Sequence, residues 1–293
     1  MIVTLTSCKQ DEVLIPGNNP PGSNAVSSII IENYVNKCFI DLLGREPIDD
    51  EMVQESSLIK EGGLADSVKL ALVQKLQFDS NWVEGDSSYH IAYNRRLYDI
   101  SKVRMVEGIS DGDLNTSIGI FSFQLESDSL SGDSAGVARW RDEIKELRRV
   151  LRLQYQFRSY KISISEVFRR LIDNSVYDEI NMNTFNFINA TFDNLYYRFP
   201  TTDEFDNSWT MIEDNSSVIL LGRNGHNRGD YMDIVTSSEE FYEGLIRWQF
   251  ETLMGREATA DESLTLLKLL LQEGYTFQQL QQYIMIDEDY SNF

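Results

Sequence analysis

The sequence predicts a mainly α-helical protein, built as an array of about four helical repeat units with one irregular insertion. The first observation behind this prediction is a motif that occurs three times in the same register, starting at Phe39, Phe192 and Phe250. The second is that apolar residues recur every three or four positions before the motif, as they do along the buried face of a helix. The third is that the 293 residues include only five prolines, so few positions oppose helix formation.

The motif aligns without gaps, and five positions carry the same residue in all three copies. These positions are Phe39, Phe192 and Phe250; Leu42, Leu195 and Leu253; Arg45, Arg198 and Arg256; Asp50, Asp203 and Asp261; and Glu51, Glu204 and Glu262. Agreement of this kind indicates a repeated structural unit rather than a chance match. We therefore expect the three leucines to be buried in the core of their units.

The residues after each leucine predict where the first helix of the unit ends. Gly44 and Gly255 stand where helices commonly end with a residue at positive φ, which glycine adopts without steric cost. Tyr197 occupies this place in the second copy, so we expect that corner to turn differently. Proline follows in two copies, as Pro47 and Pro200, and opposes continuation of the helix.

The end of the motif predicts the start of a second helix. The sequences TTDE at 201–204 and TADE at 259–262 are capping boxes, in which the threonine and the glutamate satisfy each other's backbone N–H groups. In the first copy Ile48 replaces the threonine, so Asp49 is the expected cap. The motif is therefore interpreted as a helix end, a corner and a helix start.

The arginine of each copy precedes the Asp-Glu pair by five and six residues. We expect Arg45, Arg198 and Arg256 to bind the Asp-Glu pair of their own corner, which includes Glu51, Glu204 and Glu262, or the carbonyls of the finished helix. A planar guanidinium bound in this way would fix the angle of the corner. The alternative is that the arginines bind a phosphate or carboxylate of a ligand.

Residues 26–293 are expected to form one helical repeat domain. Its units are predicted at residues 26–85, 86–180, 181–242 and 243–293. The second unit is inferred because residues 163–177 match the end of the last copy, although the motif near residues 93–98 is lost. Residues 107–136 interrupt this unit and are the predicted insertion, a hairpin or a loop over the core. Units of this size are typical of helical repeat arrays.

The first 25 residues differ from the rest of the chain. LTSC at residues 5–8 resembles a bacterial lipobox, and KQDE at 9–12 resembles the surface-export signal of Bacteroidetes-type lipoproteins. This resemblance implies that Cys8 is lipidated, that residues 1–7 are the remnant of a signal segment, and that residues 8–25 hold the lipidation site and a flexible tether. The alternative is the N-terminal end of a cytosolic protein.

The LLGRxPTxxE corner resembles short helical modules of unknown function in bacterial surface and envelope proteins. The resemblance covers about half of the chain and rests on the repeated corners. It implies a helical fold at the cell envelope, and it supplies no catalytic residues.

The charge of the chain is strongly acidic, with 26 basic and 47 acidic residues and a net charge of −21. Such a surface repels nucleic acid, so no nucleic-acid partner is expected. Residues 135–170 are the exception, since they hold ten of the basic residues and four of the acidic ones. This stretch is interpreted as a solvated face that balances the acidic protein, or as a docking face for an acidic partner or an anionic glycolipid.

Signals of catalytic or metal chemistry are weak. The two histidines, His90 and His226, are far apart, and no His/Cys cluster has metal-ligand spacing. Residues 111–115 begin like a calcium loop but lack its glycine and its final glutamate. The glycine-rich segment 222–230 is expected to be a mobile connector between helices. No catalytic residue, cofactor or metal is predicted.

We therefore expect a non-enzymatic outer-membrane lipoprotein that acts as an accessory or scaffold subunit of a cell-envelope complex. The first alternative is a surface lipoprotein that binds a glycan or a peptide, and a concave aromatic cluster would favour it. The second is a hydrolase with scattered carboxylates, which two carboxyl groups about 5–10 Å apart in a cleft would favour. The expected location is the outer membrane, lipid-anchored at the cell surface; the alternative is the cytoplasm.

Overall fold

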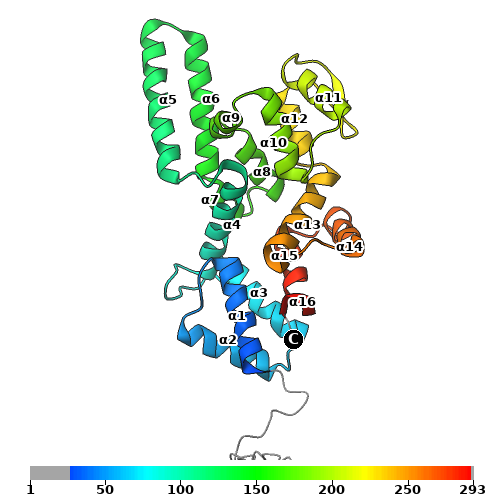
Figure 1. The fold of residues 1–293 in the computed structure, drawn as a ribbon. Helices are drawn as coiled ribbons and strands as arrows, with labels where there is room; N and C mark the ends of the chain where they lie inside the picture. The colour runs from blue at the N-terminus through cyan, green and yellow to red at the C-terminus, as the bar shows by residue number, and fades with distance from the viewer. Residues whose placement is uncertain (1–26, 292–293) are drawn as a thin grey trace, which may run out of the picture.

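The computed structural model describes residues 27–291 as a mainly helical protein, which confirms the predicted fold class. The first part contains α1 (Ser28–Leu43), α2 (Asp49–Glu61), α3 (Asp66–Phe78), α4 (Tyr89–Val106), α5 (Asp111–Ser131), α6 (Ser134–Leu151), α7 (Leu153–Arg158) and α8 (Ile164–Ile172). The second part contains α9 (Ser175–Asn181), α10 (Thr184–Tyr196), α11 (Thr202–Ile212), β1 (Val218–Leu220), β2 (Arg223–Gly225), α12 (Arg228–Val235), α13 (Glu239–Met254), α14 (Ala260–Leu271), α15 (Phe277–Met285) and α16 (Glu288–Ser291). Figure 1 shows these elements in an elongated body.

The three motif copies lie at the ends of α1, α10 and α13. Leu42, Leu195 and Leu253 are buried in the core, as the alignment predicts. Removing such a side chain from water contributes about 1.5–3 kcal/mol, so each first helix is held mainly by its apolar face. The predicted boundary at residue 243 falls inside α13, which begins at Glu239 with Ser238 as its N-cap.

All three corners turn in the same way. Gly44, Tyr197 and Gly255 follow their helices in the left-handed region, with φ of 75°, 59° and 65°. The expectation that Tyr197 makes a different corner is therefore wrong. A tyrosine in this conformation is strained by about 1–3 kcal/mol, and its ring is stabilised by the guanidinium groups of Arg104 and Arg247, which lie 4.3 and 4.6 Å from its centroid.

The second helix of each unit begins with a cap. Thr201 and Thr259 form the predicted capping boxes at the starts of α11 and α14. In the first copy Asp49 is not the cap, because α2 begins one residue earlier than that prediction requires, with Ile48 in the N-cap position. The Ile48 N–H donates to Glu51 Oε2 at 2.9 Å, so the glutamate half of the box is kept without a hydroxyl.

The last unit packs against the first. Gln77 near the end of α3 donates to Gln281 of α15 at 3.2 Å, and Tyr34 of α1 donates to the Met285 carbonyl. Figure 1 shows the C-terminal helices beside α1 and α3. The array therefore closes on itself instead of leaving its two ends apart.

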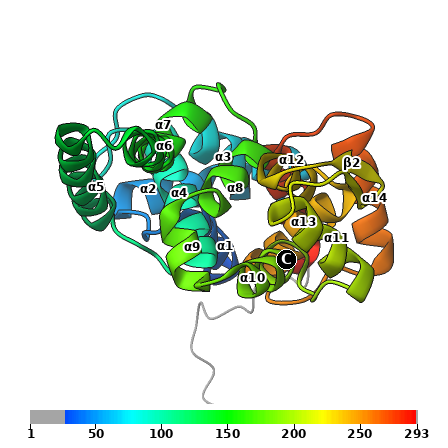
Figure 2. The same ribbon diagram turned by 90° about the horizontal axis from the view of Figure 1, so that it is seen from above.

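The predicted irregular insertion is regular. Residues 111–151 form two helices, α5 and α6, which pack on each other and stand out from the body in Figures 1 and 2. Ser110 caps α5, and Gly132 makes the turn into α6 at φ 82°. The ring of Phe121 stacks on Trp140 with centroids 5.2 Å apart. Packing within this pair outweighs the low helix propensity of its serines and glycines.

The glycine-rich segment 222–230, which was expected to be a mobile connector, contains regular secondary structure. β2 within it pairs antiparallel with β1, and α12 begins at Arg228.

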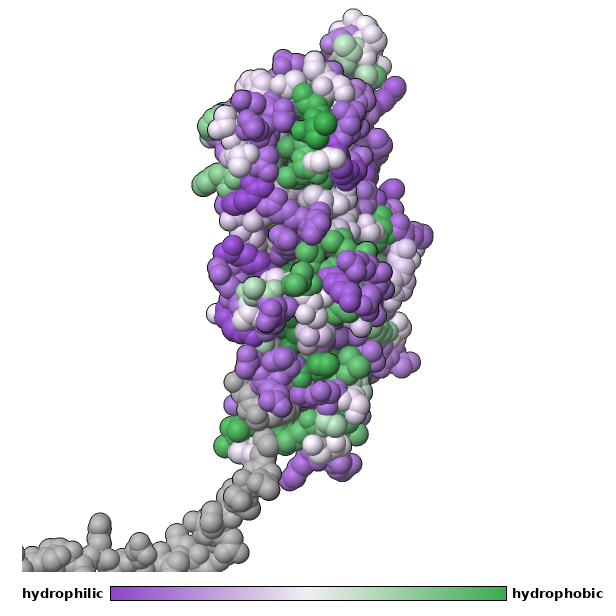
Figure 3. Space-filling model, turned by 90° about the vertical axis from the view of Figure 1, so that its right-hand side faces the viewer, coloured by the Kyte–Doolittle hydropathy of each residue, from purple (hydrophilic) through white to green (hydrophobic). Residues whose placement is uncertain are grey.

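Within residues 27–291, no helix has the length and hydropathy that crossing a bilayer requires. On the face shown in Figure 3, hydrophobic residues gather in several separate patches along the body.

Candidate ligand-binding pocket

Arg45 holds the first corner through two acids. Its Nη1 and Nη2 donate to the two carboxylate oxygens of Glu51 at 2.8 Å each, and its Nε donates to Asp86 at 2.7 Å. The carboxylates are shielded from water, since the Glu51 and Asp86 side chains are 9% and 8% exposed. A bidentate pair of this kind fixes the orientation of both partners.

The other two corners repeat this arrangement. Arg198 binds Glu204 through two bonds of 2.7 Å, and Arg256 binds Glu262 at 2.9 and 2.7 Å. The additional acid is Asp86 in the first corner, Glu240 in the second and Asp289 in the third. The arginine hydrogen bonds lower the pKa of Glu204 and of Glu262 to about 2. These contacts support a structural role for the three arginines, because their donors are directed at acids of the protein itself.

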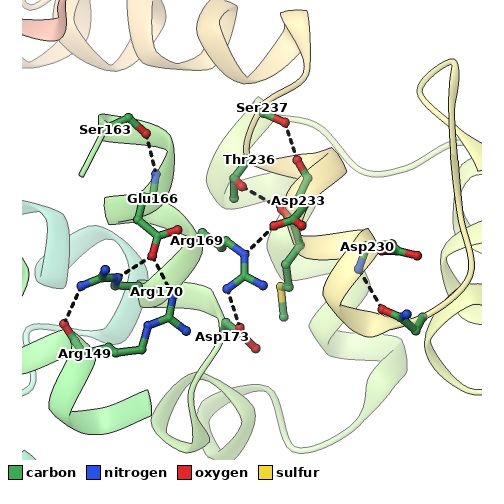
Figure 4. A network of polar contacts seen from close by, with 12 residues as sticks. Arg149, Ser163, Glu166, Arg169, Arg170, Asp173, Asp230, Asp233, Thr236 and Ser237 are labelled. Carbon is green, nitrogen blue, oxygen red and sulfur yellow. Dashed lines mark hydrogen bonds and ion pairs between the residues drawn. The ribbon is translucent and has the colours of Figure 1, made fainter. Parts of the chain in front are cut away.

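Three arginines of the basic stretch 135–170 form ion pairs inside the molecule. Arg149 and Arg170 both donate to Glu166, at 2.7 and 2.6 Å, and Arg169 donates to Asp233 at 2.6 Å (Figure 4). These pairs join α6, α8 and α12. This part of the stretch therefore balances charge within the protein.

The outer side of α6 carries the other basic residues of this helix, and they are exposed. Exposed basic residues recur at helical spacing along it: Arg141, Lys145, Arg148 and Arg152. Among the described residues, the three arginines of this row have no ion-pair partner. The row keeps open the interpretation that the stretch meets an acidic partner or an anionic glycolipid.

The segment that begins like a calcium loop is the start of α5. Asp111 accepts hydrogen bonds from Tyr98 at 2.7 Å and from Lys102 at 2.9 Å, and Asp113 accepts one from the Ser110 hydroxyl at 2.6 Å. Within residues 27–291, no group of three or more His, Cys, Asp or Glu residues is arranged to hold a metal ion.

The two cysteines lie in different parts of the chain. Cys8, the predicted lipidation site, lies outside the described residues. Cys38 is buried in the core, and burial raises the pKa of its thiol to about 12. Its thiolate is therefore disfavoured near neutral pH, and the residue acts as a small apolar side chain.

A pocket of about 640 Å³ lies where the first, second and fourth units meet. Six aromatic side chains line it: Phe78, Phe157, Tyr160, Tyr242, Tyr275 and Phe277. Its walls come from the end of α3, the segment between α7 and α8, the first half of α13 and the segment between α14 and α15. The volume is in the range of small-molecule and peptide side-chain sites.

The position of the pocket depends on a close helix crossing. A Cβ added at Gly244 of α13 would lie 1.9 Å from the Leu195 carbonyl oxygen, so only glycine lets α13 approach α10 this closely. The next residue, Leu245, lines the pocket. Tyr160, which also lines the pocket, is 69% exposed and has a φ of 55°, a strained conformation for a residue other than glycine.

Several polar groups of the pocket are already engaged within the protein. The Ser163 and Thr276 hydroxyls cap α8 and α15, and the Tyr242 hydroxyl lies 3.3 Å from that of Ser165. Lys161 is the charged residue of the lining. Apolar contact therefore dominates what the pocket offers.

The sequence did not single out the residues of this pocket. An aromatic residue at helical spacing usually belongs to the core, so the sequence by itself favours core positions for these side chains. Phe78 and Tyr160 are exposed only because α3 ends and α7 turns away beside them. The positive φ of Tyr160 is imposed by the fold, and no local sequence pattern indicates it.

A comparison of the chain with protein-family models, curated proteins and solved structures finds no match.

Proposed function

We propose that this chain is a non-enzymatic binding protein that holds an apolar segment of a partner polypeptide in the aromatic pocket. The observation that carries the proposal is the lining of six aromatic side chains around about 640 Å³. Aromatic rings supply large contact areas at low entropic cost, which is why they dominate the energetics of protein interfaces. The proposal unites the expected accessory role in a complex with the peptide-binding alternative.

A peptide fits this lining better than a glycan does. Each sugar hydroxyl that leaves water needs a hydrogen-bond partner, because an unpaired one costs about 1–3 kcal/mol. The hydroxyls of Ser163 and Thr276 are already committed to helix caps. An apolar peptide side chain makes no such demand, and Lys161 at the wall favours an acidic residue beside it.

The hydrolase alternative receives no support from this pocket. Hydrolysis of a glycosidic bond by carboxylates needs two such groups facing each other across the substrate. The residues that line the pocket include neither aspartate nor glutamate.

The proposed location of the protein is the outer membrane, to which lipidation of Cys8 would attach it. This part of the proposal rests on the sequence of residues 5–12 and on the polar tether that follows. A tethered body with a binding pocket suits a subunit that recruits a partner at the cell envelope. If Cys8 is not lipidated, the same pocket would serve a cytoplasmic scaffold.

The test is a selection of peptides from a random 12-residue library displayed on phage, with the Cys8→Ser chain as bait. We expect enriched peptides to carry aromatic or large aliphatic residues. Their affinity is then measured by fluorescence anisotropy. Tyr160→Gly removes a rim ring and suits the positive φ, so it should weaken binding about tenfold, as loss of one buried aromatic contact would.

The matched control is Trp82→Ala. Trp82 is 77% exposed and does not line the pocket, so its replacement should change the affinity less than about twofold. Selection of no apolar peptide, or equal affinity of the selected peptides for the Tyr160→Gly chain, would overturn the proposal.

A further inference from the structure

A second hollow, of about 430 Å³, lies between α4, α10 and α13. It shares no lining residue with the aromatic pocket, so it is a separate feature. Its walls include Ile100, Val103 and Trp248, and Arg104 is the positively charged residue of the lining.

Arg104 is held in place but not neutralised. Its guanidinium carbon lies 4.3 Å from the Tyr197 ring centroid and 5.8 Å from that of Trp248, and its Nη2 donates to the Asn194 carbonyl at 2.5 Å. No carboxylate in residues 27–291 lies within ion-pair distance of it. An oriented guanidinium with no ion-pair partner, beside a hollow, offers the kind of donors that a carboxylate accepts from.

Two arginines near Arg104 do have carboxylate partners. Arg247, which also lies over the Tyr197 ring, is paired with Glu251 at 3.1 Å and Glu257 at 2.6 Å. The nearby corner arginine, Arg198, binds two glutamates. Arg104 therefore differs from its neighbours in having no carboxylate partner among residues 27–291.

Tyr197 gives independent support. The two sister corners use glycine at this position, whereas Tyr197 adopts the same left-handed conformation at a cost in strain. Its ring lies against Arg104, with the guanidinium carbon 4.3 Å from the ring centroid. The ring thus occupies an unfavourable position in which it supports Arg104, and such strain is typical of functional sites.

We propose that this hollow binds a single carboxylate carried on a short apolar body, as at the C-terminus of a peptide that ends in an aliphatic residue. Arg104 would receive the carboxylate, and Ile100, Val103 and Trp248 would contact the apolar body. Asp193 on the rim adds a negative charge, which disfavours a phosphate or a dicarboxylate. A free monocarboxylic acid presents the same chemistry as the peptide terminus.

The test uses three probes and ligand-observed NMR on the full chain. The probes are acetyl-Ala-Ala-Leu with a free carboxylate, the same tripeptide as its C-terminal amide, and hexanoate. We expect the acid to bind about tenfold more tightly than the amide, because hydrogen bonds to a charged group are worth that much. Binding of hexanoate as tight as that of the acid would support the site and assign it to free acids.

Three variants test whether Arg104 is the group that recognises the carboxylate. Arg104→Gln should abolish the preference for the acid, whereas Arg95→Gln should keep it, because Arg95 is exposed on the same helix. Tyr197→Gly keeps the corner, which glycine forms in the sister copies, and removes the ring beneath Arg104; it should also abolish the preference. Equal binding of acid and amide, or a preference that survives both Arg104→Gln and Tyr197→Gly, would overturn the proposal.

Discussion

Gln282 of α15 donates its side-chain amide to the Gln77 side-chain oxygen of α3 at 2.7 Å, across 205 positions of sequence. Both side chains are buried, and Tyr93 adds a hydroxyl that donates to Gln281 at 2.7 Å. Buried amides are stabilising only when they are paired, since a lone one loses its bonds to water. This network therefore makes the contact between the first and last units specific.

Gln77→Ala should lower the free energy of unfolding by about 1–3 kcal/mol, because it leaves buried groups of α15 without partners. Urea unfolding followed by circular dichroism measures the change. Gln74→Ala is the control, since Gln74 is exposed and its bond to Gln282 is 3.5 Å long; its effect should stay within about 0.5 kcal/mol. Equal effects of the two replacements would show that the buried network does not stabilise the closure.

The corners could be predicted from the sequence because their physics is local. The glycine, the arginine and the glutamate of the first corner, Gly44, Arg45 and Glu51, lie within one turn and one cap, so their spacing alone predicts their meeting. The closure could not be predicted in this way. Gln77 and Gln282 are polar residues that would normally be exposed, and only the path of the whole chain brings them together.

Tyr197 shows the same limit within a single corner. Its left-handed conformation is unfavourable locally, so the sequence favours a different turn. The groups that stabilise it, Arg104 and Arg247, come from α4 and α13. The pocket and the Arg104 hollow also join residues of several units, and no motif within one unit could reveal them.

Arg45→Ala should be more destabilising than Arg256→Ala. Removal of Arg45 leaves two shielded carboxylates, and breaking a buried ion pair costs about 3 kcal/mol or more. Arg256 is paired with acids that are 25% and 69% exposed, so its loss should cost about 1 kcal/mol or less. Chemical denaturation of both variants measures the difference. The reverse order would contradict the assignment of the first corner as the more buried one.

The stability supplied by Glu262 should depend on pH. Hydrogen bonds from Arg256 lower its pKa from 4.5 to about 2 in the folded chain. A lowered pKa stabilises the folded state above the unfolded value and loses that effect as the pH falls toward the folded value. The Glu262→Gln chain keeps a residue able to form the capping box but has no charge there.

The wild-type chain should therefore exceed the Glu262→Gln chain in stability by a constant amount above about pH 5, and this difference should shrink between about pH 4.5 and 2. Urea midpoints of the two chains at several pH values measure it. Comparison with the variant removes the contributions of the other carboxyl groups, which both chains share. A difference that stays constant down to pH 3 would show that the Arg256 contact does not lower this pKa.

Cys8→Ser should release the protein from the membrane fraction of its native host. The lipobox-like residues 5–8 and the acidic run at 9–12 motivate this prediction. Burial of an acyl chain contributes about 0.8 kcal/mol per methylene, so the roughly three chains of a bacterial lipoprotein would hold it permanently. Without the thiol no acyl chain can be attached, and a body of charge −21 is repelled by anionic headgroups.

Cell fractionation of wild-type and Cys8→Ser strains, with the gene expressed from its native start, measures this release. Cys38→Ser is the matched control, because the buried Cys38 cannot be acylated in the folded chain and its replacement should leave the protein with the membrane. If the Cys8→Ser protein sediments as the wild type does, another contact holds it there. If mass spectrometry of the native protein finds Cys8 unmodified behind an intact Met1, the lipid anchor does not exist. The aromatic pocket would then have to meet its partner in the cytoplasm.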